Sequence, residues 1–64
     1  MDWLDIEDIA ELLHEKYPEQ DIYSLKFTNL KKMIMELEDF EGEEHKCNEK
    51  ILESVQGMWF EIKK

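Results

Sequence analysis

Apolar residues recur every three or four positions in three parts of the chain, which is the spacing of one face of an α-helix. The pattern therefore predicts an all-α fold, a compact three-helix bundle with short links between its helices. The three apolar stripes comprise Ile6, Ile9, Ala10, Leu12, Leu13 and Tyr17; Leu30, Met33, Ile34 and Leu37; and Ile51, Leu52, Val55, Met58, Trp59 and Ile62.

Local signals set the ends of these helices. Pro18 should end the first helix, because the residue before a proline avoids the helical region. Thr28 is the expected N-cap of the second helix, and Asn48 or Cys47 is expected to start the third. Between the first two helices, residues 25–27 are predicted to form a short extended segment without a partner strand, so no sheet is expected.

The length of 64 residues predicts a single domain over residues 1–64. A domain of this size buries only about 60% of the surface of its unfolded chain, so its stability should be marginal. Its one cysteine excludes an internal disulfide and fits a reducing compartment. With neither a signal peptide nor a long apolar run, we expect a cytoplasmic protein, without membrane contact and monomeric.

The charge is strongly acidic, with 17 aspartates and glutamates against 8 lysines, no arginine, and a net charge of −9. Nucleic-acid binding usually relies on clustered Lys and Arg, so a helix-turn-helix DNA-binding role is disfavoured. Cations and positively charged protein surfaces are the partners that this charge favours.

One concentration of carboxylates lies between the second and third helices, where several oxygen ligands together can hold a hard cation. An EF-hand is excluded, because a loop starting at Asp39 has Glu44 instead of glycine at its sixth position and Lys50 instead of glutamate at its twelfth. Weak, exchangeable cation binding and a merely solvated connection both remain open. The residues concerned are Glu36, Glu38, Asp39, Glu41, Glu43 and Glu44.

A second concentration of carboxylates lies along the first helix, where Glu7, Glu11 and Glu15 stand four residues apart. Like charges at this spacing repel one another, so the row would gain from a basic partner, although ordinary solubility explains it equally well. Together with part of the loop, it gives the candidate partner-binding residues: Asp5, Glu7, Asp8, Glu11, Glu15, Asp39, Glu41 and Glu43.

Other chemistry has weaker signals. His45 and Cys47 stand two residues apart, but a zinc site needs about four ligands and only His14 remains. Sulfur transfer through Cys47 would need a lowered thiol pKa, whereas neighbouring carboxylates raise it. No nucleophile with a base and no phosphate-binding loop is recognisable, so no catalytic residues are predicted and the chain is not expected to be an enzyme.

The order and spacing of several short motifs resemble the IscX family (YfhJ), small acidic proteins of bacterial iron–sulfur cluster assembly. The motifs are Trp3, "YP" at 17–18, "FT" at 27–28, "LEDF" at 37–40, "NEKILE" at 48–53 and Trp59. The likeness runs without gaps from Trp3 to the C-terminus. The chain departs from the family pattern in its "EGEE" loop, in Met33, Lys31 and Lys26, and in Cys47, where serine is usual.

The resemblance implies a helical bundle with a winged-helix-like topology and no tightly bound cofactor. It also implies weak binding of Fe(II) or Fe(III) through exposed carboxylates, and binding to a basic patch of a cysteine desulfurase in competition with frataxin. The predicted function is an acidic adaptor or regulator of iron–sulfur cluster assembly; the alternative is a generic acidic interaction module that binds neither iron nor a desulfurase.

Overall fold

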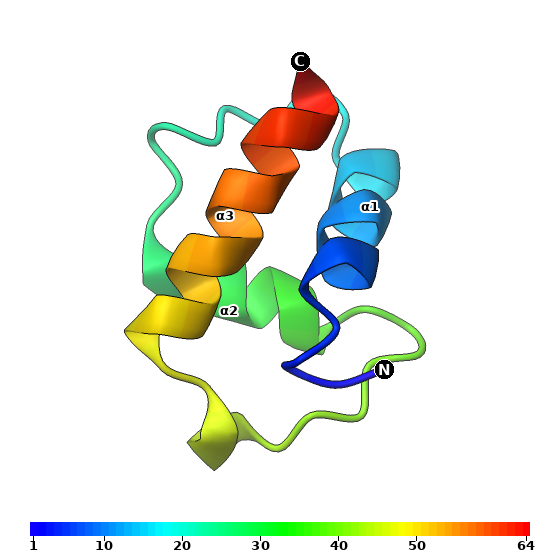
Figure 1. Ribbon diagram of the computed structural model, residues 1–64, viewed down its shortest axis with the longest axis vertical. Helices are drawn as coiled ribbons and strands as arrows, with labels where there is room; N and C mark the ends of the chain where they lie inside the picture. Colours follow the sequence, from blue (N-terminus) through cyan, green and yellow to red (C-terminus); the bar gives the residue numbers. More distant parts are fainter.

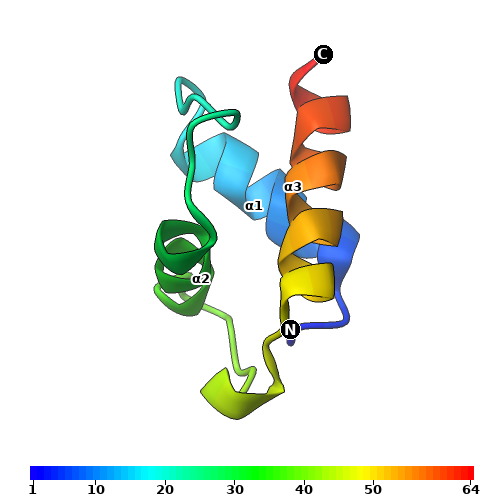
Figure 2. The same ribbon diagram turned by 90° about the vertical axis from the view of Figure 1, so that its left-hand side faces the viewer.

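The computed structural model describes residues 1–64 and consists of three α-helices and one short 3₁₀-helix. The elements are α1 (Ile6–Lys16), α2 (Phe27–Met35), η1 (Glu44–Lys46) and α3 (Glu49–Lys63). α1 packs mainly against α3, and α2 runs across the back of α3 (Figures 1 and 2). The predicted all-α, three-helix fold is confirmed; no segment forms a strand, so the structure has no wing of the winged-helix type.

The three apolar stripes meet in one core. Eleven hydrophobic residues are buried, and no polar or charged residue is buried with them. Trp59 is the largest fully buried side chain, so α3 supplies the centre of the core. The helices contribute Ile9, Ala10 and Leu13, Leu30 and Ile34, and Leu52, Val55 and Trp59, while Trp3, Ile22 and Leu37 come from outside them.

The helix ends agree with the prediction in two cases and differ in one. α1 ends before Pro18, and the Asn48 side chain caps α3 by accepting a hydrogen bond of 2.9 Å from the Ile51 N–H. The prediction for α2 was wrong: the helix begins at Phe27 with Lys26 as its N-cap, so Thr28 lies inside the first turn and caps nothing. Of the predicted extended segment 25–27, Lys26 has extended backbone angles, but the prediction was wrong for Phe27, which is helical.

Leu12 and Leu37 differ from their predicted places. Leu37 is buried but lies beyond the end of α2, in a turn where its N–H donates to the Ile34 carbonyl. Leu12 was predicted to face the core, yet its side chain is 37% exposed on the outer side of α1. The reason is geometric, since Leu12 stands about 100° around the helix from Leu13, which is fully buried.

The structure contains no helix that is both long enough and apolar enough to span a membrane.

Candidate functional site

Every one of the 17 carboxylate side chains is exposed, so all of them are open to solvent and to partners. Their distribution over the surface therefore decides which can act together. Two of the predicted groups, one on α1 and one in the loop after α2, meet on the same side of the molecule.

The α1 contribution follows from helical spacing. Asp8, Glu11, Leu12 and Glu15 stand at positions i, i+3, i+4 and i+7, which share one face of a helix. They border a shallow hollow of about 280 Å³, together with Met1 and Asp39.

The loop after α2 borders a second hollow, of about 460 Å³. Leu12, Glu15 and Asp39 line both hollows, so the two are adjacent. We call the combined surface the acidic face; its six carboxylates, arranged around Leu12, are Asp8, Glu11, Glu15, Glu36, Glu38 and Asp39.

None of these six carboxylates forms an ion pair within the chain. The ion pairs of the structure involve other acids: Glu41 with the Met1 ammonium (3.9 Å), Glu44 with Lys31 (3.7 Å) and Glu61 with Lys64 (3.4 Å). The Glu43 carboxylate lies 3.4 Å from Nδ1 of the His45 imidazole. Lys16 is the one lysine that lines the acidic face, and its ammonium lies 5.6 Å from the centre of the Tyr17 ring. The face therefore has a surplus of negative charge that the protein itself does not neutralise.

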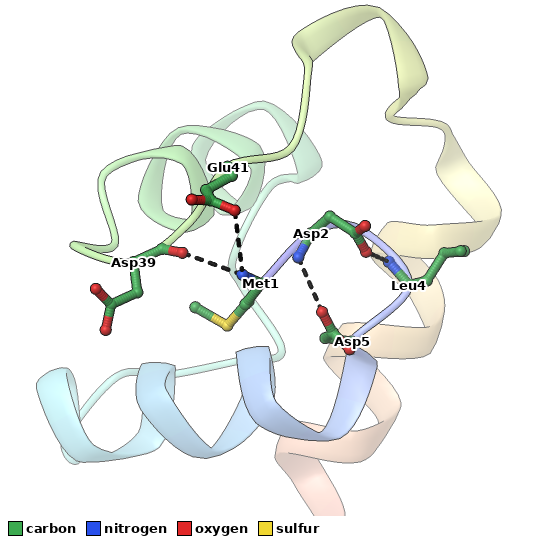
Figure 3. Close-up of polar contacts among 6 residues, drawn as sticks. All are labelled: Met1, Asp2, Leu4, Asp5, Asp39 and Glu41. Atoms are coloured by element: carbon green, nitrogen blue, oxygen red, sulfur yellow. Dashed lines mark hydrogen bonds and ion pairs between the residues drawn. The ribbon is translucent and has the colours of Figure 1, made fainter.

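The N-terminal segment holds the loop against α1 (Figure 3). The Met1 ammonium donates to the Asp39 carbonyl oxygen over 3.3 Å, and the Glu41 N–H donates to the Met1 carbonyl over 2.8 Å. The Asp39 carboxylate points away from the ammonium, so it stays available on the acidic face.

Trp3 fixes the next part of the same loop. Its indole N–H donates to the Glu43 carbonyl over 2.6 Å, and its ring meets the Phe40 ring edge to face with centroids 4.6 Å apart. The buried Trp3 thus ties residues 40–43 to the core.

The structure divides the six loop residues of the predicted iron site. Glu36, Glu38 and Asp39 belong to the acidic face, while Glu41 and Glu44 each lie next to a cation and Glu43 lies next to the His45 imidazole. Nowhere do three or more His, Cys, Asp or Glu side chains come together closely enough to hold one metal ion. Any iron bound here would keep many of its water ligands.

The predicted partner-binding residues are divided in the same way. Asp8, Glu11, Glu15 and Asp39 lie on the acidic face, whereas Glu41 and Glu43 lie outside it. Two α1-side residues also lie outside it. The Asp5 carboxylate accepts the Asp2 N–H over 2.9 Å, which closes the turn before α1 (Figure 3), and Glu7 is exposed but borders neither hollow.

Sequence reasoning missed Leu12 as a surface residue. Ile9 and Leu13 already fix which side of α1 faces the core, and Leu12 stands in register with Asp8 and Glu15. This register, read around the helix, was the available signal.

Cys47 has no metal-ligand or nucleophilic environment. Partial burial raises the pKa of its thiol; Lys31 opposes this rise and Glu44 adds to it. The thiol is therefore less ionised at neutral pH than an ordinary cysteine, which disfavours sulfur transfer. The nearby His45 side chain is exposed and faces Glu43.

Comparison with known proteins places the whole chain in one family. The sequence matches the family described as iron–sulphur cluster assembly over residues 1–64. It is also 36% identical to an uncharacterized protein of Pseudomonas aeruginosa over 59 residues, which cover 92% of this chain and 89% of that protein. With its helical fold and acidic face, the chain belongs to the iron–sulphur cluster assembly family.

Proposed function

We propose that the chain is an IscX-like adaptor whose acidic face docks on a basic patch of a cysteine desulfurase, in competition with frataxin. The observation that carries the proposal is the gathering of six exposed carboxylates, from α1 and from the loop after α2, without one ion pair among them. A basic partner would relieve their mutual repulsion, and its charges would speed association at low salt.

The docking test compares two variants with the same change in net charge. Glu11→Gln/Glu15→Gln/Asp39→Asn removes three charges from the acidic face, and Glu19→Gln/Glu49→Gln/Glu53→Gln removes three exposed charges elsewhere. Exposed ion pairs contribute about 0.2–1 kcal/mol each, so the first variant should raise the Kd for the desulfurase about 3- to 150-fold. Equal losses in both variants would show that net charge, and not the acidic face, governs binding.

The competition with frataxin has its own measurement. Preformed complex of frataxin and the desulfurase should release frataxin as the unmodified chain is added, because both proteins would use the same basic surface. Simultaneous binding of both, as a ternary complex at saturation, would contradict the competition while leaving the docking proposal intact.

We further propose that the acidic face binds Fe(II) or Fe(III) weakly as cargo. Carboxylate oxygens suit such ions, and the absence of a built metal centre makes the expected binding weak and exchangeable. Docking and iron binding would then use one surface, so each should weaken the other.

The two halves of the predicted iron set give a matched test. Two triple variants each remove three charges from the same loop: Glu36→Gln/Glu38→Gln/Asp39→Asn is the first, and Glu41→Gln/Glu43→Gln/Glu44→Gln is the second. The first should lower Fe(II) binding more in anaerobic titration calorimetry, because Glu41 and Glu44 already have a cation nearby. An equal or larger loss in the second variant would contradict this assignment. Absence of both iron and desulfurase binding would favour a generic acidic interaction module.

A further inference from the structure

Leu12 is an exposed apolar side chain among the carboxylates of the acidic face. It borders both hollows of the acidic face and is 37% exposed. Two further apolar residues line the hollows, Met1 in one of them and the buried Leu37 in the other. The other residues that line them are charged.

An apolar centre with a charged rim is the arrangement found in protein–protein interfaces. Residues at such centres lose their water on binding and contribute most of the affinity, while the charged rim contributes mainly to association rate and specificity. Hydrated iron binds through oxygen ligands, and a leucine side chain offers it none. The acidic face therefore has one feature that iron binding leaves unexplained.

We propose that Leu12 is the apolar anchor for a basic segment of a partner protein, one that places a single apolar side chain between lysines or arginines. Charge complementarity selects this occupant. A second copy of the chain would bring its own net charge of −9 against the same carboxylates, and a nucleic acid would bring phosphates. The inference rests on the proposed function in assigning the segment to a cysteine desulfurase.

The two parts of the surface should affect binding differently. Salt screens the carboxylates, so their contribution falls as ionic strength rises. The contact at Leu12 depends on apolar area removed from water, so it should slow dissociation without changing the salt dependence. Losing the apolar area that Leu12 would bury on binding should weaken binding about 5- to 30-fold.

The test uses Leu12→Ala with Leu4→Ala as the matched control. Leu4 is 82% exposed and lies outside the acidic face, so it loses the same atoms from a different surface. Alanine is a good helix former and Leu12 is outside the core, so Leu12→Ala should fold, which circular dichroism would check. Leu12→Met restores apolar area and should recover most of the affinity.

Biolayer interferometry against the cysteine desulfurase, at several salt concentrations, should give faster dissociation and a 5- to 30-fold higher Kd for Leu12→Ala, with an unchanged salt slope. Leu4→Ala should bind like the unmodified chain. If Leu12→Ala also binds normally while Glu11→Gln/Glu15→Gln/Asp39→Asn does not, the anchor is refuted and the docking proposal stands. If the unmodified chain does not bind the desulfurase, both are refuted.

Discussion

Replacing Gly42 by alanine should destabilise the fold, although Gly42 has an ordinary negative φ that alanine could adopt. The reason is space. A Cβ atom at this position would lie 2.5 Å from Cζ of Phe40 and 2.8 Å from Cδ1 of Trp3. Nonbonded carbon atoms normally rest about 3.5–4.0 Å apart, so at least one ring has to move.

The cost depends on which ring moves. Phe40 is half-buried and its far edge can turn, but Trp3 is buried and bonded to the Glu43 carbonyl. Overpacking of this kind costs about 1–3 kcal/mol, and a lost aromatic edge contact accounts for about 0.5–1.5 kcal/mol. We therefore expect a loss of about 1–3 kcal/mol in the free energy of unfolding. In a domain of this size, each kcal/mol lost lowers Tm by about 4–8 °C.

Gly57 provides a control with the opposite expected sign. It is exposed within α3, and a Cβ there would meet no atom within 4 Å. Gly57→Ala should stabilise the protein by about 0.8–1 kcal/mol, because alanine has the higher helix propensity.

Urea unfolding followed by far-UV circular dichroism would measure both variants under the same conditions. Gly42→Ala should have a lower unfolding midpoint than the unmodified chain, and Gly57→Ala a higher one. Stabilisation of both variants would mean that Trp3 and Phe40 do not close over Gly42 as described.

Three further changes test other contacts. Asn48→Ala removes the cap bond to the Ile51 N–H and should cost about 1 kcal/mol in urea unfolding; no change would contradict the cap. The Trp59 indole N–H is buried without a partner, whereas the Trp3 N–H donates to the Glu43 carbonyl. Trp59→Phe and Trp3→Phe remove the same atoms from buried positions, but only Trp3→Phe also loses a hydrogen bond of about 0.5–1.5 kcal/mol, so it should have the lower unfolding midpoint. Because burial raises the thiol pKa of Cys47, iodoacetamide should alkylate the folded chain more slowly than the urea-unfolded chain near neutral pH, and the rate should rise with pH. Lys31→Met should slow the alkylation of the folded chain further, since Lys31 lowers this pKa. Equal rates in the folded and unfolded chains would contradict the prediction.

The helices were predictable because their signals are local. Pro18 and Asn48 act on their own backbone neighbours, and the apolar period of α3 leads directly to a buried Trp59. The N-cap prediction for Thr28 was wrong because threonine is common both at the N-cap and in the first turn of a helix. Phe27 packs against the core as the first residue of α2, and this long-range contact cannot be read from the sequence.

The acidic face was predictable in its parts but not in its assembly. Charge counting found both Glu15 on α1 and Asp39 in the loop, but their meeting depends on long-range contacts. These are the hydrogen bonds from Met1 to residue 39 and from Trp3 to residue 43, which join segments about 40 residues apart. The division of the six predicted iron-site residues has the same cause, because only the fold decides that Lys31 pairs with Glu44.

If a basic partner docks on the acidic face, amide NMR of the chain will show which surface the partner covers. Adding unlabelled cysteine desulfurase to the ¹⁵N-labelled chain should broaden or shift the signals of α1 around Leu12 and of residues 36–39. Signals around Ser54 and Glu61 on α3, which border neither hollow, should change little. Changes centred on α3, with α1 unaffected, would contradict the account.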